Sequence, residues 1–255
     1  MTKVKDIFAY LCEFAPLELQ SDYDNSGFLI GHAEKEVSKV LLSLDVTDEV
    51  VDEAIEKDSD LILSHHPVIW DKLKAVTDDN STNRKLLRLI ENQIAVISMH
   101  TNLDITSGGV NDVLMELLGA TNDGFFEAEH CGRRGHLTEA FSMPAFLKLC
   151  KEKLQTNGLR YYDAGRPVEK IAVLGGAGGD SLLDAFAAGC DTYLTADIKY
   201  HTFLLARELG INLIDGDHFC TENPVIYRLQ SRLNDAFPDV FFQVSGRHDQ
   251  TVRFF

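Results

Sequence analysis

Two long stretches of this chain follow the same pattern at a constant offset. Residues 37–40 correspond to residues 168–171, and residues 60–64 correspond to residues 191–195, each 131 positions later (168 − 37 and 191 − 60). In both copies an apolar run precedes a helical stretch and a second apolar run. Strands that alternate with helices indicate largely parallel strands with helices packed on them. The repeat therefore predicts an α/β fold built from two structural repeats.

The same repeat predicts how the chain divides. The helical stretches between the apolar runs are residues 49–57 in the first copy and 181–188 in the second. We expect residues 1–125 to form the first repeat and residues 126–225 to form the second. Residues 226–255 follow the second copy, and we expect them to pack back on the first repeat.

Two adjacent histidines end an apolar run of the first copy. His65 and His66 follow residues 61–63, which read as a buried strand, and Pro67 prevents that strand from simply continuing. In an open α/β sheet, ligands bind at the carboxyl ends of the strands. Side chains alternate across a strand, so the two imidazoles can converge only where the backbone turns. On this evidence alone, a purely structural role for the pair stays open.

A histidine and an acid four positions apart follow a further apolar run in each copy. His100 and Asp104 form this pair in the first copy, and His218 and Glu222 form it in the second, at an offset of 118 (218 − 100). If the chain turns helical there, a step of four places both side chains on one face. One such pair alone is more simply explained as part of an exposed polar loop. Two pairs at corresponding positions favour a shared site.

The two copies differ in chemistry, because His65 and His66 correspond to Ala196 and Asp197. A site shared between the halves would take its adjacent histidines from one half only. The candidate ligands are His65, His66, Asp104, His218 and Glu222, with His100 close by. Imidazoles and carboxylates without thiolates suit divalent Zn, Mn, Fe, Co or Ni. A catalytic zinc typically uses three protein ligands, so this set indicates two ions, with Glu222 as our candidate for the bridging carboxylate.

The motifs resemble those of the GTP cyclohydrolase I type 2-like family, also called the NIF-three-like proteins. The resemblance is carried by Ser-His-His-Pro at residues 64–67, by His-Thr-Asn-Leu-Asp at residues 100–104 and by Gly-Asp-His-x3-Glu at residues 216–222. Residues 24–31 and 197–201 are also similar to signatures of that family. The matching motifs run from about residue 15 to residue 224 and so cover most of the chain.

The resemblance implies two intertwined repeats with small mixed, mostly parallel sheets, in a short form without a ferredoxin-like insert. It implies a dinuclear site with two divalent ions per subunit and five protein ligands, which are His65, His66, Asp104, His218 and Glu222. His100 would line the site as a candidate catalytic residue for proton transfer. The assembly would be a homohexameric ring built from dimers.

The chain departs from the family pattern at several positions. Tyr23 stands where the family usually has tryptophan, Ser26 replaces a small aliphatic residue, and Ala196 replaces a glycine. Arg133 and Arg134 make their segment more basic than the family pattern. We expect these departures to concern the substrate pocket more than the metal site.

The function predicted by these features is metal-dependent hydrolysis, in which metal-bound water attacks an electrophilic carbon or phosphorus. In a GTP cyclohydrolase-type purine ring opening, that carbon is C8 and formate is lost. His100 or a carboxylate would transfer protons, because imidazole titrates near neutral pH. One alternative is a nucleotide or phosphoester hydrolase. Another is a non-catalytic metal-binding scaffold, a metal chaperone or a partner in DNA maintenance.

Composition favours a cytoplasmic protein with a small-molecule substrate. The net charge of −16 argues against a broad nucleic-acid surface, which needs clustered Lys and Arg. No apolar run approaches the roughly 20 residues of a membrane span, and no signal peptide is evident. The five cysteines form no Cys-x-x-Cys pair, and an odd count argues against a disulfide framework.

Several further features have two interpretations. The glycine-rich residues 175–179 are either a tight strand-to-helix turn or an anion contact. Cys220 is either a soft metal ligand or a small buried side chain, and His201 either ends a helix or borders the site. Trp70 is either a lid or a contact between subunits. Asp24 and Asp45 are candidates to contact the site. The remaining histidines are expected at the surface: His32, His130, His136 and His248.

Overall fold

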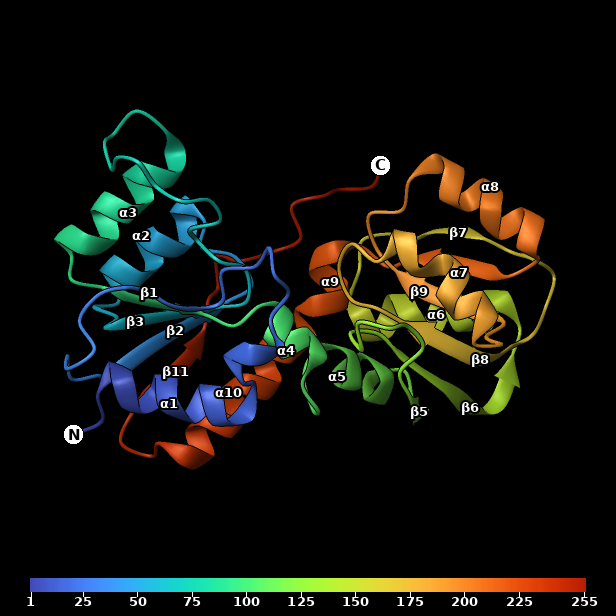
Figure 1. The fold of residues 1–255 in the computed structure, drawn as a ribbon, viewed down its shortest axis with the longest axis horizontal. Helices are drawn as coiled ribbons and strands as arrows, with labels where there is room; N and C mark the ends of the chain where they lie inside the picture. Colours follow the sequence, from blue (N-terminus) through green and yellow to red (C-terminus); the bar gives the residue numbers. More distant parts are fainter. The chain divides into compact units, whose positions relative to one another are not determined.

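The computed structural model describes residues 1–255, which divide into two compact units. Unit 1 comprises Met1–Thr106 and Ile226–Asp249, and unit 2 comprises Ser107–Val225 and Gln250–Phe255. Each unit consists of one sheet with helices on both of its faces (Figure 1). The chain therefore leaves unit 1 after Thr106 and returns to it after Val225.

Unit 1 is built on a five-stranded sheet of order β1-β4-β3-β2-β11. Its elements in chain order are α1 (Val4–Phe14), the 3-10 helix η1 (Leu17–Leu19), β1 (Gly27–Ile30), β2 (Lys39–Ser43), α2 (Asp48–Glu56), β3 (Leu61–Ser64), α3 (Ser81–Glu91), β4 (Ala95–Ser98), α4 (Thr101–Ile105), most of α10 (Pro224–Ala236) and β11 (Phe241–Val244). All neighbouring strands are parallel except β1, which runs antiparallel to β4 at one edge.

Unit 2 is built on a six-stranded sheet of order β5-β6-β8-β9-β10-β7. Its elements in chain order are α5 (Val110–Leu117), β5 (Ala120–Gly124), β6 (Arg133–Phe141), α6 (Met143–Leu154), β7 (Arg160–Tyr162), β8 (Val168–Val173), the 3-10 helix η2 (Gly179–Ser181), α7 (Leu182–Ala187), β9 (Thr192–Thr195), α8 (Tyr200–Leu209), β10 (Asn212–Asp215) and α9 (His218–Glu222). The strands β8, β9 and β10 are parallel, and the other neighbours are antiparallel.

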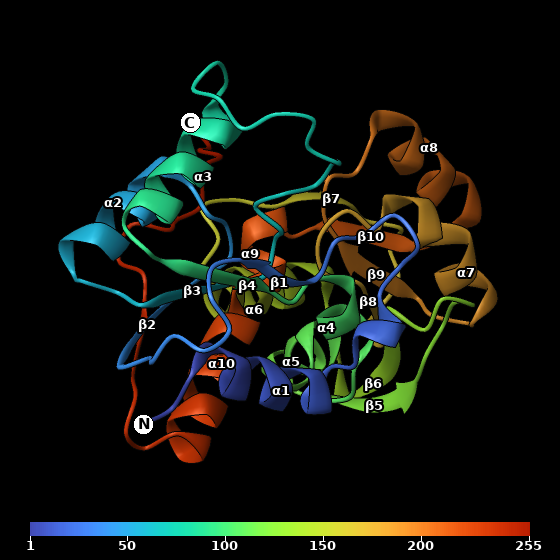
Figure 2. The ribbon, with the colours of Figure 1, turned by 60° about the vertical axis from the view of Figure 1, so that its left-hand side comes forward.

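The central strands of both sheets are buried on both faces, which is why they read as continuous apolar runs in the sequence. In unit 1, Leu41, Ile62 and Val96 pack against α2 and α3, while α1 and α10 cover the opposite face (Figures 1 and 2). In unit 2, α7 and α8 pack around Tyr193 on one face, and α5 and α6 pack around Ile171 on the other. The predicted fold class, with two mixed and mostly parallel sheets flanked by helices, is confirmed.

The internal repeat is a repeat of strand register. Val40 pairs with Leu61 in unit 1, and Ile171 pairs with Thr192 in unit 2, 131 positions later on both strands. The Asp60 carboxylate accepts hydrogen bonds from the backbone N–H groups of Ser38 and Lys39, and Asp191 does the same at the corresponding positions of unit 2. Each aspartate thus ties the loop before the second strand to the start of the first.

The boundary between the units differs from the predicted one. The predicted division after residue 125 falls 19 residues beyond Thr106, where unit 1 leaves its first segment (125 − 106). The reason is that β5 pairs with β6, and α5 buries Leu114 and Met115 in the core of unit 2. The returning segment of unit 1 ends at Asp249, because Gln250–Phe255 belong to unit 2.

No helix of the chain has the length and apolar character that a bilayer crossing requires.

The strands β2, β3 and β4 of unit 1 all end near the same edge of their sheet, and the predicted histidines follow two of them. That edge is therefore where the candidate ligands of unit 1 are placed.

Candidate metal centre

Three imidazoles meet at the carboxyl ends of β3 and β4 in unit 1. The ring centroids of His65 and His66 lie 4.9 Å apart, those of His65 and His100 lie 5.1 Å apart, and those of His66 and His100 lie 5.4 Å apart. Each of the three rings offers a nitrogen within 4.8 Å of the other two, so these residues could hold a metal ion. Two of them come from the adjacent pair, and the third comes from the His-x-x-x-acid motif.

A backbone turn after β3 allows the adjacent histidines to converge. The Leu44 carbonyl accepts hydrogen bonds from the N–H groups of His65 (3.2 Å) and His66 (2.9 Å). The Ser64 hydroxyl donates to the His66 carbonyl (2.9 Å), which further stabilises the turn. Side chains that would alternate across a regular strand are thereby brought to neighbouring positions.

Each of the three imidazoles is held at Nδ1 by an oxygen. The partners are the Met99 carbonyl for His65 (2.8 Å), the Asp45 carboxylate for His66 (2.7 Å) and the Asp24 carboxylate for His100 (2.8 Å). An oxygen that accepts from Nδ1 keeps the proton on that nitrogen and leaves the lone pair on Nε2. Metal-binding histidines in proteins usually carry such an outer partner. The three rings are therefore prepared to bind through Nε2.

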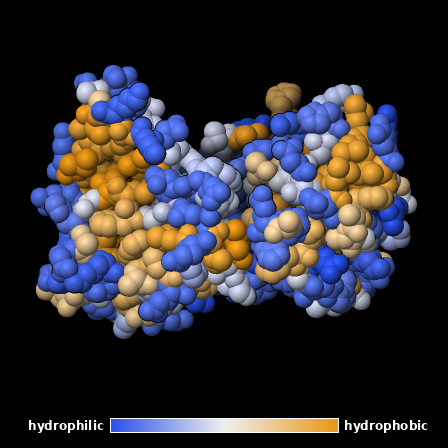
Figure 3. Space-filling model, in the orientation of Figure 1, coloured by the Kyte–Doolittle hydropathy of each residue, from blue (hydrophilic) through white to orange (hydrophobic).

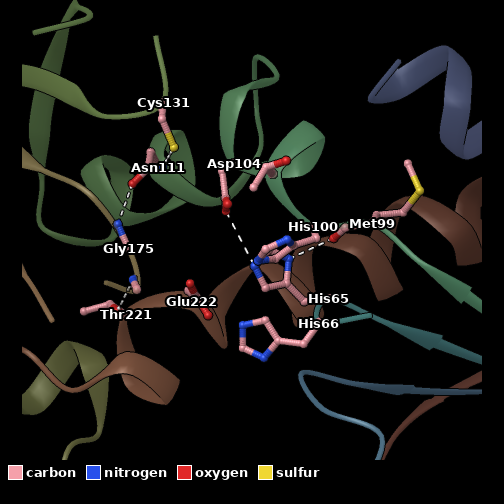
Figure 4. Close-up of polar contacts among 12 residues, drawn as sticks. His65, His66, Met99, His100, Asp104, Asn111, Cys131, Gly175, Thr221 and Glu222 are labelled. Carbon is pink, nitrogen blue, oxygen red and sulfur yellow. Dashed lines mark hydrogen bonds and ion pairs between the residues drawn. The ribbon is translucent and has the colours of Figure 1, made fainter. Parts of the chain in front are cut away.

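Asp104 adds a carboxylate to this cluster. Its Oδ1 lies 3.5 Å from His65 Nε2, on the side of the ring opposite to Met99 (Figure 4). Asp104 is buried, and its backbone N–H bonds to the His100 carbonyl (3.1 Å), so the predicted four-residue step is one turn of helix α4. A buried carboxylate is stable when it is paired or hydrogen-bonded, and a divalent cation is one partner that suits these donors.

Asp24 orients His100 and is fully buried as a side chain. It accepts hydrogen bonds from the His100 ring, from the Thr101 backbone and hydroxyl, and from the Ser26 hydroxyl. Burial alone would raise the pKa of Asp24, but these hydrogen bonds outweigh it and hold the pKa well below its usual range. The Ser26 hydroxyl also accepts the His100 N–H (3.0 Å). Ser26, which departs from the family pattern, therefore helps to fix the position of His100.

Unit 2 contains a smaller group of the same kind, with one histidine and one acid. His218 and Glu222 lie one turn apart on α9, with His218 Nε2 3.1 Å from Glu222 Oε2. His218 Nδ1 is held by the Asp197 carboxylate (2.8 Å). Asp197 corresponds in the repeat to His66 (66 + 131). This position therefore carries a site imidazole in unit 1 and the carboxylate that binds a site imidazole in unit 2.

The glycine-rich turn of unit 2 forms a wall against Glu222, which is 3% exposed. Gly176 has a φ of +69°, and a Cβ on it would lie 2.1 Å from Glu222 Oε1. The N–H groups of the turn are used internally: Gly175 donates to Asn111 Oδ1 (2.8 Å) and Gly176 donates to Thr221 Oγ1 (3.0 Å) (Figure 4). These contacts favour the tight-turn interpretation of residues 175–179 over the anion contact.

Neither Cys220 nor His201 belongs to a group of side chains that could hold a metal ion. Cys220 is buried inside α9, and burial raises the pKa of its thiol to about 12, with the Asp217 carboxylate adding to the effect. The protonated thiol favours the interpretation of Cys220 as a small buried side chain. His201 is exposed at the start of α8.

Trp70 lies beside the histidine cluster of unit 1. Its ring centroid is 5.1 Å from that of His100 in an edge-to-face arrangement, and the side chain is half exposed. The Asn25 amide donates to the neighbouring Ile69 carbonyl (2.7 Å) and holds the loop there. Trp70 thus offers an aromatic surface next to His100.

The histidines expected at the surface divide into two groups. His32, His130 and His136 are exposed, as predicted. The prediction is wrong for His248, which is half-buried and accepts the Leu44 N–H at Nδ1 (3.1 Å). His136 also has a carboxylate at Nδ1, from Asp123 (2.7 Å), so an outer partner alone does not distinguish a metal-binding histidine; clustering does.

Sequence reasoning named Asp24 and Asp45 as candidates but missed Asp197 and the Met99 carbonyl as partners of site histidines. The signal for Asp197 was its correspondence to His66 in the repeat. The ligand set of five residues stays a prediction.

The whole chain resembles proteins of one family. The family model described as Duf34/NIF3 (NGG1p interacting factor 3) matches residues 2–249. The chain is 36% identical over 251 residues to the GTP cyclohydrolase 1 type 2 homolog of Clostridium perfringens, covering 95% of this chain and 96% of that one. It is 30% identical over 224 residues to the GTP cyclohydrolase 1 type 2 of Helicobacter pylori, covering 87% and 88%. The crystal structure of Staphylococcus aureus protein SA1388 superposes with a TM-score of 0.91 at 27% identity, covering 99% of both chains.

Proposed function

This chain belongs to the Duf34/NIF3 family, and we propose that it is a hydrolase that depends on two divalent metal ions. The observation that carries the proposal is the cluster of His65, His66 and His100, in which every Nδ1 is held by an oxygen. Three clustered rings oriented in this way beside the buried Asp104 have the arrangement that metal-binding histidines show in proteins. The bound ions would supply a water molecule of lowered pKa.

The donor set fits the proposed metals. It contains imidazole nitrogens and carboxylate oxygens without thiolate, which suits Zn, Mn, Fe, Co or Ni. We propose His65, His66 and Asp104 of unit 1 and His218 and Glu222 of unit 2 as the ligands. Met99, Asp45 and Asp197 would keep the protons of the three ligand imidazoles at Nδ1.

The path of the chain supports a centre to which both units contribute. Unit 1 ends its first segment at Thr106, two residues after Asp104, and unit 2 ends its long segment at Val225, three residues after Glu222. Both acids therefore lie within three residues of a point at which the chain passes from one unit to the other. A carboxylate bridge from Glu222 is our proposal for the shared ligand.

We propose that His100 transfers a proton during the reaction. Its Nδ1 is held by Asp24, whose charge persists because the pKa of that carboxyl lies well below its usual range. An ionised partner fixes the orientation of the ring and keeps its Nδ1 proton in place, with Nε2 on the other side of the ring. His100 also lies close enough to His65 and His66 to be a ligand, so its role requires a direct test.

The substrate class proposed is a purine nucleotide, and the reaction is a GTP cyclohydrolase-type opening of the ring. The names of the Clostridium perfringens and Helicobacter pylori relatives refer to GTP and apply to those proteins. In this chain, Trp70 offers a half-exposed aromatic ring beside His100, and aromatic rings pack well on planar bases. This surface supports a planar substrate close to the proposed metals.

We also propose that the protein is a cytoplasmic homohexamer. Exposed apolar side chains occur on both units, for example Ile90 on α3, and Leu183 and Phe186 on α7, where apolar surface gathers (Figure 3). Exposed apolar patches support contacts between subunits. The mass in solution tests this proposal, since six chains of 28.5 kDa give a much larger particle than one or two.

The experiment that tests the function combines metal content with turnover. The purified protein is loaded with Zn or Mn, its metal equivalents per subunit are measured, and formate release from GTP is followed. The matched controls are the His65→Ala/His66→Ala variant, which should lose metal and formate release, and His32→Ala, which changes an exposed histidine of the same unit.

Three results are informative. Two equivalents with formate release support the proposal in full. Two equivalents without formate release retain the metal centre, exclude GTP and direct the search to other nucleotides and phosphoesters. Well under one equivalent after loading overturns the metal-dependent hydrolase and favours a non-catalytic scaffold.

A further inference from the structure

His248 contacts the backbone behind the histidine pair. It follows β11 in the returning segment of unit 1, and its Nδ1 accepts the Leu44 N–H (3.1 Å). A ring nitrogen that accepts from a backbone N–H must carry a lone pair, so the ring is neutral with its proton on Nε2. Burial lowers the pKa of His248, against the opposing charges of Asp45, Glu53 and Asp249, and so favours that neutral ring.

The segment that His248 contacts positions both adjacent histidines. The peptide joining Ser43 to Leu44 donates its N–H to His248, and its carbonyl accepts the N–H of His65 (3.3 Å). One residue further on, the Leu44 carbonyl accepts the N–H groups of His65 and His66. The next residue is Asp45, whose carboxylate holds His66 Nδ1 (2.7 Å). A peptide is planar, so fixing its N–H also fixes the direction of its carbonyl.

The segment that carries His248 is itself anchored by a buried carboxylate. Glu53 on α2 is 3% exposed and accepts hydrogen bonds from the Ser245 hydroxyl and from the N–H groups of Gly246 (3.1 Å) and Arg247 (3.2 Å). The Ser245 N–H in turn donates to the Leu42 carbonyl (2.8 Å). A buried carboxylate is stable only when its oxygens are satisfied, and here one turn of chain supplies three of the donors. The position of His248 is thus set by the fold of unit 1.

The repeat provides an internal parallel. Leu44 corresponds to Gly175 (44 + 131), and the Gly175 N–H donates to Asn111 Oδ1 (2.8 Å). Asn111 is fully buried and comes from α5, which lies outside the repeated strands, as His248 also does. In each unit, therefore, a side chain from a separate segment accepts the N–H at the corresponding position of the repeat, at the sheet edge where the candidate ligands lie.

We propose that His248 is a positioning residue for the metal-binding pair, acting through its Nδ1 on the backbone at Leu44 to fix His65 and His66. It touches neither the metals nor the substrate in this role. The proposal rests on the metal centre proposed above and extends it to a residue from the other end of the chain.

The test compares two substitutions of His248. His248→Asn keeps an acceptor, since the asparagine Oδ1 lies close to the position of the histidine Nδ1. In unit 2, Asn111 accepts the corresponding N–H in this way. His248→Leu removes the acceptor at similar size. The dissociation constant for Co²⁺ is measured by competition with a chelator, and the visible spectrum of bound Co²⁺ reports the ligand geometry. His32→Ala is the control, and thermal melting of each metal-free variant checks its folding.

We expect His248→Leu to weaken Co²⁺ binding about 10- to 100-fold, as loss of an outer partner typically does, and to alter the spectrum. His248→Asn should stay within about threefold of the unchanged protein, well inside the effect expected for loss of the partner. Equal binding by His248→Leu and the unchanged protein overturns the proposal. Binding by His248→Asn as weak as that of His248→Leu also overturns it, because His248 would then act through Nε2.

A further measurement keeps the proposal testable if His248→Leu does not fold. Hydrogen exchange at the Leu44 N–H of the metal-free, unchanged protein should be slowed, and exchange at an unprotected rate overturns the contact. Failure of the proposed function gives a different result, namely no Co²⁺ binding by the unchanged protein. The two failures are therefore distinguishable.

Discussion

At the scale of single residues, each site histidine is oriented by an outer partner from elsewhere in the chain. His66, His100 and His218 each present Nδ1 to a carboxylate, and the three carboxylates come from 21, 76 and 21 positions away in the chain. The histidines could be predicted because they follow apolar runs and recur in the repeat. Their partners could not all be predicted, because tertiary contacts and not local spacing bring them together.

The role of His100 is the first residue-scale prediction. His100→Ala should retain the metal content of the unchanged protein and lower turnover about 10²- to 10⁴-fold, the range for a group that transfers protons. Metal analysis and formate release are measured on the same samples, and added imidazole should restore part of the rate. Loss of one metal equivalent would instead identify His100 as a ligand.

Glu53 carries the second prediction, which concerns pH. Burial alone would raise the pKa of Glu53, but hydrogen bonds from Lys57, Ser245 and the Gly246 backbone outweigh it and lower the pKa to about 2. A carboxyl with a lowered folded pKa stabilises the fold above its ordinary value of 4.5, and this contribution is lost as pH falls toward 2. We expect the contribution to fall by about 2 kcal/mol between pH 6 and pH 3.

The measurement for Glu53 is urea unfolding of the unchanged protein and of Glu53→Gln across that pH range. The glutamine has no charge to lose, so its free energy of unfolding should fall less steeply with decreasing pH. Parallel curves for the two proteins would show that Glu53 does not titrate in this way.

At the scale of elements, the internal repeat predicted the strands and helices that occur in both copies, but not the elements that occur in only one. The helical stretches at residues 49–57 and 181–188 agree closely with α2 (Asp48–Glu56) and α7 (Leu182–Ala187). The antiparallel edge strands β1 and β7 were missed, because each is short and lies outside the matching anchors. The boundary after residue 125 was placed too late, since β5 carries few buried side chains and reads like a loop.

The turn before α7 provides an element-scale prediction. Gly176→Ala places a Cβ 2.1 Å from Glu222 Oε1 and should displace that carboxylate, with a loss of metal affinity of at least about tenfold, as for a disturbed ligand partner. Gly189→Ala is the matched control, because Gly189 also has a positive φ (+80°) but no atom within 4 Å of the added Cβ. Both variants should lose about 1 kcal/mol of stability from backbone strain.

Chelator competition and thermal melting separate the two effects. Only Gly176→Ala should weaken metal binding, while both should melt lower than the unchanged protein. Equal metal affinity in the two glycine variants would mean that the turn does not position Glu222.

At the scale of the whole molecule, the chain builds two units from one plan and then makes them chemically unequal. The candidate site group of unit 1 has three imidazoles and the buried Asp104, while the pair on α9 of unit 2 has one imidazole and the buried Glu222. Gly176 corresponds to Asp45, and Asp197 corresponds to His66, so the same positions of the repeat carry different chemistry in the two units. Neither unit alone provides the five-ligand set proposed for two ions.

That inequality leads to a prediction about the whole chain. If both units contribute ligands to one centre, metal binding should slow hydrogen exchange at the end of β3 and also in α9, which belong to different units. His65→Ala/His66→Ala changes unit 1 only, yet it should abolish most of the metal-dependent protection of α9. Glu222→Gln should likewise abolish the protection near β3, since an amide carries no charge to bridge two ions. Glu208→Gln, an exposed position of α8, should preserve both effects. Protection of α9 that survives the loss of both histidines would mean that unit 2 binds its metal independently, and the bridging role of Glu222 would then be wrong.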